Sequence, residues 1–345
     1  MKRVGIVGDG YTAAELLRLL LPMDEYDVTY ISSADNIGTA VSALYPQFGD
    51  MTQLVCEPTA TEAIISRCDG VFLALPHGQS MPLAAALIEA GLYCVDLGAD
   101  FRLRDAGLYR SYYELEHTAP ELLSTAVYGI PELYREQIAV ARLIANPGCF
   151  PTSAIMPLVP LLAAGLIEHK GIIVDSKSGV SGAGRGMKET SHYCNVNEGV
   201  HPYGVGTHRH APEIRQQLEL AAAGSVQMVF TPHLIPMSRG ILTTTYSYLA
   251  DGANEGDARA ALAQAYKGEY FVHLLPPGQW PHTRWVYASN HVQISLAQDK
   301  DSHILTAVCA IDNLCRGASA QAVQNMNLML GIPERRGLEL IGLYP

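Results

Sequence analysis

The chain has 345 residues, of which 48% are hydrophobic and 17% charged, and its formal net charge is -11. This length exceeds one ordinary hydrophobic core, so we expect two domains, and the composition excludes intrinsic disorder. The acidic balance argues against nucleic acid as a partner, no apolar run has the length to cross a membrane, and an odd number of cysteines without a C-x-x-C pair predicts a reduced, cytoplasmic protein.

A dinucleotide-binding pattern comes first in chain order. Residues 2–7 form an apolar strand, a glycine turn follows at 8–13, and 14–21 have helical spacing. In the arrangement strand, G-x-G-x-x-A, helix, the glycines let the backbone approach a pyrophosphate that the helix N-terminus binds. We therefore predict cofactor contacts from Gly8, Gly10, Tyr11, Thr12 and Ala13. An ordinary glycine-rich turn is the alternative.

The end of the second strand bears on the choice of cofactor. A strand predicted at 27–31 is followed by Ser32 and Ser33, where NAD-binding proteins usually place an acid that holds the ribose hydroxyls. Serines can donate hydrogen bonds to a phosphate, whereas an acid would repel it. We therefore predict that the cofactor is NADP(H).

Further strands at 71–75, 93–97 and 142–145 alternate with helical segments such as 81–90. This alternation predicts an α/β fold with a Rossmann-type doubly wound parallel sheet. Loops at the carboxyl ends of such strands face the ligand. We therefore expect His77, Gly78 and Ser80 near the cofactor, with a structural role as the alternative for His77.

One cysteine stands where a strand passes into a helix. The run Asn146-Pro147-Gly148-Cys149-Phe150-Pro151 connects an apolar strand at 141–145 to a helical segment at 152–164. At the start of a helix, free N–H groups and the helix dipole favour an anion and lower the pKa of a thiol. We predict that Cys149 is a nucleophile; a buried structural cysteine is the alternative.

The second half of the chain has a different pattern of predicted strands and helices. Alternating apolar and polar residues predict strands at 171–177, 226–231, 241–249, 292–297 and 303–311, with helices at 212–223 and 255–266. This pattern predicts an α+β domain with a mixed or antiparallel sheet. We place a cofactor domain at 1–148 and a catalytic, substrate and dimerisation domain at 149–315, and expect the C-terminal helix within 316–345 to pack back onto the first domain.

Three loops of this half, at 178–186, 206–214 and 231–240, carry polar residues suited to a ligand, and the third contains Arg239. In the glycine-rich stretch 178–186, Ser178, Gly179 and Gly182 can approach the cofactor closely. Near a helix start, either His208 or His210 can exchange protons with a thiol. We expect no metal, because that helix start makes a His-x-His ligand pair doubtful.

A nicotinamide cofactor and a cysteine at a helix start together suggest reduction through a thioester. In this chemistry the thiolate attacks an activated acyl group, and arginines of an acidic chain bind the anionic groups of the substrate. The candidate arginines are Arg102, Arg185, Arg209 and Arg239.

These features resemble the N-acetyl-gamma-glutamyl-phosphate reductases, which are related to the aspartate-semialdehyde dehydrogenases. The shared motifs run from Gly10-Tyr11-Thr12 through Leu75-Pro76-His77-Gly78, residues 99–103, 147–152, 178–185 and 207–214 to residues 312–318 and 321–325. The first glycine turn is one residue shorter than usual in that family, and Ala13 stands where the family has glycine.

The resemblance implies NADPH-dependent reduction of a small acyl phosphate, N-acetyl-L-glutamyl 5-phosphate, by a homodimer or homotetramer. It marks Cys149 as the nucleophile, and Asn313 and Gly317 as cofactor contacts. We choose His210 as the acid/base because it is closest to the helix start. The alternatives are a reductase of aspartyl phosphate or of a carrier-protein-bound aminoadipyl or glutamyl phosphate, a cysteine hydrolase, and a non-catalytic NADP sensor.

Overall fold

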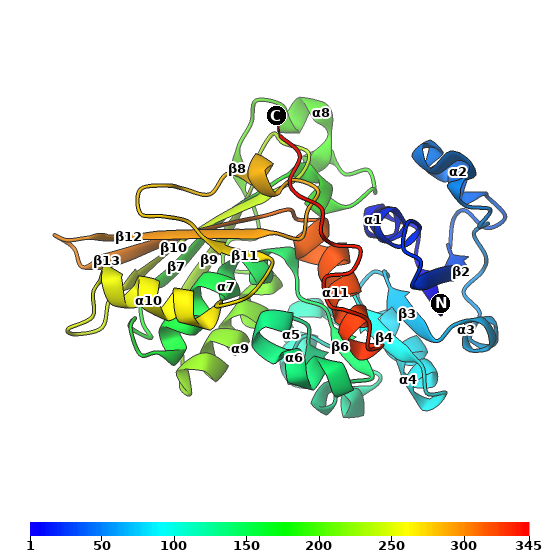
Figure 1. Ribbon diagram of the computed structural model, residues 1–345, viewed down its shortest axis with the longest axis horizontal. Helices are drawn as coiled ribbons and strands as arrows, with labels where there is room; N and C mark the ends of the chain where they lie inside the picture. The colour runs from blue at the N-terminus through cyan, green and yellow to red at the C-terminus, as the bar shows by residue number, and fades with distance from the viewer. Residues whose placement is uncertain (345) are drawn as a thin grey trace. The chain divides into compact units, whose positions relative to one another are not determined.

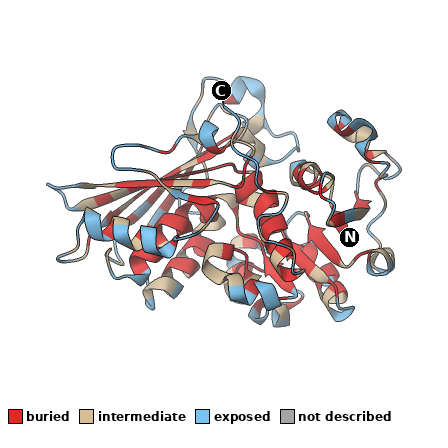
Figure 2. Cartoon of the chain, in the orientation of Figure 1, coloured by how far each residue is buried: buried red, intermediate tan, exposed pale blue. Residues whose placement is uncertain are grey.

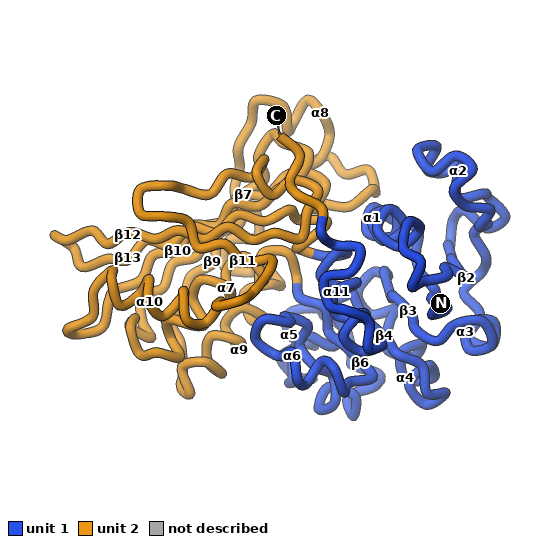
Figure 3. Tube along the Cα trace, viewed as in Figure 1, with its two compact units in different colours: residues 1–147, 318–339 blue, residues 148–317, 340–345 orange. Residues whose placement is uncertain are grey.

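The chain divides into two compact units. The computed structural model describes residues 1–344. Unit 1 comprises residues 1–147 and 318–339, and unit 2 comprises residues 148–317 and the chain from Leu340 onward (Figure 3). The expected break after residue 148 lies one residue earlier. Of the segment 316–345, residues 316–317 and Leu340 onward group with unit 2, and Pro345 lies outside the described residues.

Unit 1 is built on a six-stranded parallel sheet with the order β2-β1-β3-β4-β6-β5 (Figure 1). The strands are β1 (Lys2–Val7), β2 (Tyr26–Ser32), β3 (Gly70–Leu73), β4 (Tyr93–Asp96), β5 (Val127–Tyr128) and β6 (Leu143–Ala145). Parallel neighbours need crossover connections, and helices supply them. The predicted Rossmann-type α/β fold is confirmed. The helices of this unit are α1 (Tyr11–Leu20), α2 (Val41–Leu44), η1 (Pro46–Met51), α3 (Thr61–Arg67), α4 (Ser80–Glu89), α5 (Ala106–Tyr113), η2 (Pro120–Ser124), α6 (Pro131–Val140) and α11 (Ala320–Met329).

The strand order reverses between β1 and β3. After β1 the chain adds β2 on one side and then returns to add β3 on the other. The Ala74 N–H donates to the Val7 carbonyl at 2.8 Å, so the loops that follow the two strands start side by side. In doubly wound sheets, ligands bind outside the strand ends at such a reversal.

The helix α11 is part of unit 1, where it contacts α1, α6 and β4. Its polar side chains are buried and take up partners from distant segments. The Asn325 amide donates to the Gly129 carbonyl and to the Asn146 side chain, both at 3.0 Å, and the Tyr26 hydroxyl donates to Asn327 at 2.8 Å. Because buried polar groups need such partners, these amides tie the helix to its unit.

The helix predicted from residue 316 begins differently. A short π-helix, η6 (Cys315–Ser319), precedes α11. The Gly317 N–H donates to the Asp312 carbonyl at 2.9 Å, a wider turn than an α-helix makes.

Unit 2 contains a seven-stranded mixed sheet with the order β11-β12-β13-β10-β7-β9-β8. Its strands are β7 (Ile172–Ser178), β8 (His201–Pro202), β9 (Met228–Leu234), β10 (Ile241–Tyr248), β11 (Val272–Leu274), β12 (Val292–Asp299) and β13 (Ile304–Ile311). The central strand β10 runs antiparallel to both β13 and β7, whereas β7 and β9 are parallel. The predicted mixed sheet is confirmed. The other elements of this unit are α7 (Cys149–Ala163), η3 (Val180–Ala183), η4 (Glu189–Ser191), α8 (Tyr193–Val196), α9 (His210–Ala222), α10 (Glu255–Ala265) and η5 (Thr283–Val286).

One face of this sheet is covered and the other is partly exposed. The helix α7 packs against β10 and β13, contacts α9 and α10, and is buried along nearly its whole length (Figure 2). A row of hydroxyls joins it to the sheet, because Thr243 bonds to Ser153 at 2.6 Å and to Ser176 at 2.8 Å. On the opposite face, Ile173 and Val229 are exposed. Within residues 1–344, no helix combines the length and apolar character needed to cross a membrane.

Candidate active site

The cysteine turn in unit 2 places a thiol on the first turn of a long helix. Gly148 is the N-cap of α7 and Cys149 is its first residue, three residues before the expected helix start. The N-cap glycine has no side chain to cap this helix end, and the first turn of the helix contains no acid. Because Pro151 has no N–H, the amides of Cys149 and Phe150 are the donors at this end. The geometry therefore favours a thiolate or an oxyanion here.

Burial separates Cys149 from most other cysteines of the chain. Its side chain is half-buried, and Cys194 is exposed. The remaining five are buried: Cys56, Cys68, Cys94, Cys309 and Cys315. Burial raises the pKa of the Cys309 thiol to about 12 and also raises the pKa of Cys68, so these thiols are protonated at neutral pH.

Two glycines are required around Cys149. A Cβ added to Gly148 would lie 2.5 Å from Nε2 of His210, and one added to Gly317 would lie 2.7 Å from the Cys149 Cβ. Real Cβ atoms do not approach other atoms this closely. The His210 ring therefore lies against the turn that carries the thiol, and Gly317 packs directly onto Cys149.

A buried glutamate that the sequence analysis missed holds the same turn. The Gly148 N–H donates to a Glu213 carboxylate oxygen at 2.9 Å, and Glu213 is only 1% exposed. Glu213 lies on α9, the helix that His210 begins, and α9 packs against α7. The contact fixes the cysteine turn relative to α9.

The two candidate histidines have different surroundings. The His208 Nδ1 accepts a hydrogen bond from the His210 N–H at 3.1 Å, so the ring caps the start of α9. Burial and then the charge of Arg209 lower the pKa of His208 to about 4. A neutral ring with its proton on Nε2 satisfies this contact. His208 also packs edge-on against Phe150 and Phe230.

Tyr203 closes the aromatic side of this cluster. Its ring packs against His208 with centroids 5.4 Å apart. Burial raises the pKa of the Tyr203 hydroxyl above its ordinary value, and the nearby Cys149 sulfur adds to the shift. The tyrosine therefore stays protonated at neutral pH.

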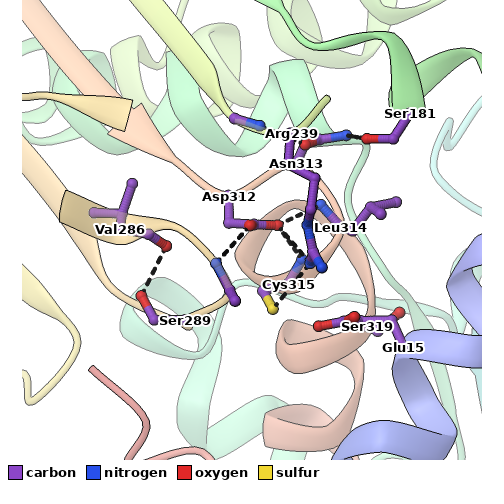
Figure 4. Close-up of polar contacts among 12 residues, drawn as sticks. Glu15, Ser181, Arg239, Val286, Ser289, Asp312, Asn313, Leu314, Cys315 and Ser319 are labelled. Atoms are coloured by element: carbon purple, nitrogen blue, oxygen red, sulfur yellow. Dashed lines mark hydrogen bonds and ion pairs between the residues drawn. The ribbon is translucent and has the colours of Figure 1, made fainter. Parts of the chain in front are cut away.

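Arg239 is oriented by a buried carboxylate at the end of β13 (Figure 4). The wholly buried Asp312 accepts a hydrogen bond from Arg239 Nη2 at 3.0 Å. The same carboxylate accepts from the backbone of Ala288 at 2.7 Å, Leu314 at 2.9 Å and Cys315 at 2.8 Å. Only 15% of the Arg239 side chain is exposed. The arginine is thus held in one orientation by a negative charge that is itself fully hydrogen-bonded.

Asn313 joins the arginine loop to the glycine-rich loop. It accepts the Gly240 N–H at 2.7 Å and donates to the Ser181 hydroxyl at 2.9 Å. A Cβ at Gly179 would lie 2.9 Å from the backbone nitrogen of Arg239, so the two loops are in backbone contact. Among the residues expected to contact the cofactor, Ser178 and Asn313 are buried inside this loop arrangement. Gly182, Arg185 and Arg209 are exposed in unit 2.

In unit 1, the glycine turn after β1 has the features that a pyrophosphate needs. Gly8 has φ +116°, and a Cβ there would lie 2.3 Å from the Ala74 carbonyl oxygen. Gly10 is the N-cap of α1, and a Cβ there would meet no atom within 4 Å. The helix starts at Tyr11, so Thr12 and Ala13 lie in its first turn. The open space beside Gly10 and the helix end fit a dinucleotide phosphate.

The serines after β2 are engaged with protein groups. The Ser32 hydroxyl accepts from Thr59 at 2.9 Å. The Ser33 hydroxyl donates to a carboxylate oxygen of Asp9 at 2.9 Å, and both serines are buried. Asp9, which the sequence analysis did not single out, thus brings an acid to the end of β2.

Asp100 organises the loop after β3. Its carboxylate accepts the N–H groups of Gly78 at 2.7 Å and Ser80 at 3.0 Å, and the Tyr109 hydroxyl at 2.8 Å. Ser80 is fully buried, whereas His77 is exposed.

Two further side chains lie at and after the end of β4, because Asp96 is its last residue and Arg102 is in the loop that follows. Burial, followed by the charge of Asp100, raises the pKa of Asp96 to about 7. Arg102 is 8% exposed and donates to the carbonyls of Asn146 at 2.8 Å and Leu97 at 2.9 Å.

Comparison with known proteins gives a separate domain match for each half of the chain. A family model described as "Semialdehyde dehydrogenase, NAD binding domain" matches residues 3–141, and one described as "Semialdehyde dehydrogenase, dimerisation domain" matches residues 149–313. The chain is 48% identical to the N-acetyl-gamma-glutamyl-phosphate reductase of Moorella thermoacetica over 100% of both chains. It is 47% identical to that of Pelotomaculum thermopropionicum over 99% of both.

The chain belongs to the N-acetyl-gamma-glutamyl-phosphate reductase family. Its fold is that of aspartate semialdehyde dehydrogenase II from Vibrio cholerae, with a TM-score of 0.72, 17% identity and coverage of 96% of this chain and 99% of that one. The Candida albicans aspartate semialdehyde dehydrogenase matches with the same TM-score and 15% identity, over 96% of this chain and 99% of that one. Membership of this reductase family makes the chain an oxidoreductase with a nicotinamide-cofactor domain.

Proposed function

We propose that the chain reduces N-acetyl-L-glutamyl 5-phosphate to N-acetyl-L-glutamate 5-semialdehyde and phosphate, with NADPH as reductant, through a thioester on Cys149. One observation carries the proposal: the thiol lies on the first turn of α7 while the His210 ring lies against Gly148. The full-length likeness to reductases named for this substrate supports the choice of acyl phosphate.

The covalent step uses groups of unit 2. His210 takes the thiol proton, the thiolate attacks the acyl carbon, and the carbon–oxygen bond to phosphate breaks, with the proton passing to the departing phosphate. The amides of Cys149 and Phe150 hold the oxyanion that forms during the attack. His208 serves as the neutral partner that positions the His210 backbone.

The reductive step completes the balance. When bound, a nicotinamide cofactor would supply the hydride that the thioester carbon needs. The carbon–sulfur bond then breaks, the aldehyde leaves, and Cys149 is again a thiolate. The glycine turn Gly8–Gly10 and the start of α1 fit the pyrophosphate of that cofactor, as argued above.

The arginines divide into two groups. Arg185, Arg209 and Arg239 are the ones we assign to the phosphate and carboxylate of the substrate. Arg102 instead supports the segment before the nucleophile turn, because its guanidinium binds the Asn146 carbonyl.

We also propose that the protein is a cytoplasmic homodimer or homotetramer. The match of residues 149–313 to a dimerisation domain supports self-association, and the exposed Ile173 and Val229 on the open face of the sheet give it an apolar surface. Seven free cysteines suit a reducing compartment. Analytical ultracentrifugation measures the state; a monomer at micromolar concentration would contradict this part of the proposal.

The reverse reaction tests the substrate and cofactor together. With phosphate present, N-acetylglutamate semialdehyde should reduce NADP⁺ at least a hundredfold more efficiently than aspartate semialdehyde. Replacing phosphate by sulfate is the control, because only phosphate can release the acyl group as the acyl phosphate. Equal rates with both aldehydes, or a preference for aspartate semialdehyde, would refute the proposed substrate.

A further inference from the structure

The carboxylate of Asp9 lies between the glycine turn and the end of β2. It accepts hydrogen bonds from the Ser33 hydroxyl at 2.9 Å and from the Asn36 side-chain amide. The backbone is fixed as well, because the Gly8 N–H donates to the Ser32 carbonyl at 3.1 Å and the Tyr45 hydroxyl donates to the Asp9 carbonyl at 2.6 Å. Asp9 is half-buried.

The location of Asp9 matters because the adenosine ribose of a dinucleotide binds at this place in a Rossmann domain. In Rossmann domains the adenosine ribose lies at the end of the second strand, beside the glycine turn, and an acid at the end of that strand accepts the ribose hydroxyl of NAD. Here the strand itself ends in Ser32 and Ser33. Asp9 supplies a carboxylate to the same place from the opposite side, out of the turn.

A carboxylate at this place treats the two cofactors differently. It can accept a hydrogen bond from a ribose 2′-hydroxyl, but it repels a 2′-phosphate, whose charge is negative at neutral pH. The hydrogen bonds from Ser33 and Asn36 come from neutral groups, so they orient the carboxylate without cancelling its charge.

We propose that Asp9 is the residue that sets the discrimination between NADP(H) and NAD(H) in this chain. The carboxylate weakens binding of the 2′-phosphate and supports the free ribose hydroxyl, so that removing its charge makes the enzyme more selective for NADPH. This inference rests on the proposed function only in taking a dinucleotide to bind at the glycine turn.

The test compares Asp9→Asn with the unchanged protein. Asparagine keeps an oxygen that accepts from Ser33 and Asn36 but removes the charge. The ratio of kcat/KM for NADPH to that for NADH should rise about tenfold. Calorimetry with adenosine 2′,5′-bisphosphate and with AMP isolates the ribose end and needs no turnover; the affinity for the bisphosphate should rise about tenfold and that for AMP should fall or stay unchanged.

Three controls separate charge from structure. Asp27→Asn removes the same charge at the exposed start of β2, and the ratio should change less than twofold. Ser33→Ala removes a hydrogen bond but keeps the Asp9 carboxylate, so the preference for NADPH should not rise. Asp9→Ser repeats the charge removal with a smaller side chain, and thermal melting shows whether each variant is folded.

The outcomes distinguish this inference from the proposed function. If Asp9→Asn and Asp9→Ser change both cofactors equally, or if Ser33→Ala produces the same rise, Asp9 is only a structural contact and the inference is wrong. If the unchanged protein prefers NADH, the proposed NADPH dependence fails, while the direction of the Asp9→Asn shift still decides the inference.

Discussion

Two helices in this molecule, α1 and α7, both begin after a glycine, but one glycine has open space around it and the other is crowded by a side chain. Both α1 and α7 follow a glycine N-cap, which has no side chain to cap the helix, and neither helix has an acid in its first turn. Gly10, at the start of α1, has open space around its α-carbon, whereas Gly148, at the start of α7, faces the His210 ring at 2.5 Å from the position of a Cβ. The first glycine leaves room for a ligand. The second allows protein groups to close around a thiol.

The largest effect that this comparison predicts is at Cys149. Cys149→Ser should lower reduction of the acyl phosphate by at least a thousandfold, because a serine hydroxyl is not ionised by the helix start. The affinity for NADPH, measured by fluorescence titration, should stay within twofold. Residual turnover above a few per cent would contradict a reaction through a thioester on Cys149.

The paired glycine variants sharpen the contrast between open and crowded helix starts. Gly148→Ala should lower kcat about a hundredfold with little change in the KM for NADPH, because the new methyl displaces His210. Gly10→Ala should do the reverse, raising the KM for NADPH about tenfold while kcat falls less than threefold. Steady-state kinetics with both substrates varied measures the two effects. Similar profiles for the two variants would contradict the distinction.

Removing the charge of the buried Asp312 carboxylate tests whether this group holds Arg239 in place for the substrate. Asp312→Asn should lower kcat/KM for the acyl phosphate about tenfold through KM and should cost about 2–4 kcal/mol of unfolding free energy, since a buried partner of a charge pair is lost. Arg239→Lys serves as the matched variant, because it keeps the charge and loses the planar geometry. If the KM for NADPH rises as much as that for the acyl phosphate, Asp312 acts on the whole fold.

The smallest predicted effect is the pH dependence of stability due to His208. Its folded pKa of about 4 lies below the ordinary 6.5, so the unfolded chain binds more protons between these values. Above pH 6.5 the ring is neutral in both the folded and the unfolded chain, so it adds no pH dependence. As the pH drops from 6.5 toward 4, the free energy of unfolding falls by about 1–3 kcal/mol. Urea unfolding at pH 7 and pH 5 should show a smaller difference for His208→Gln than for the unchanged chain.

Much of the fold could be predicted because its strands are apolar and bounded by turn residues. β1 has the expected limits of 2–7, and β10 and β13 each begin or end within one residue of the expected positions. The helix α7 starts three residues before the predicted position, and Pro151 lies in its first turn, where proline is well tolerated. The strands β5, β8 and β11 were missed, since two or three residues are too few to show a period.

The candidate site was predictable only where its signal is local. The cysteine turn carries its own glycine and prolines within a few residues. Glu213 and Asp312 carry no such signal, because they bind groups 65 and 73 residues away in sequence. For Ser33 the sequence showed a hydroxyl, but not that a carboxylate 24 residues earlier accepts its hydrogen bond.

The way burial sorts the seven thiols also makes the protein suitable for site-selective chemistry. Five cysteines are shielded, so an electrophilic reagent in water meets only Cys149 and Cys194. Replacing Cys194 by serine would leave a chain in which one accessible sulfur is also the proposed nucleophile. A fluorophore or an isotope-enriched alkyl group attached there would report directly on the start of α7, and its rate of attachment as a function of pH would measure how strongly that helix end acidifies a thiol.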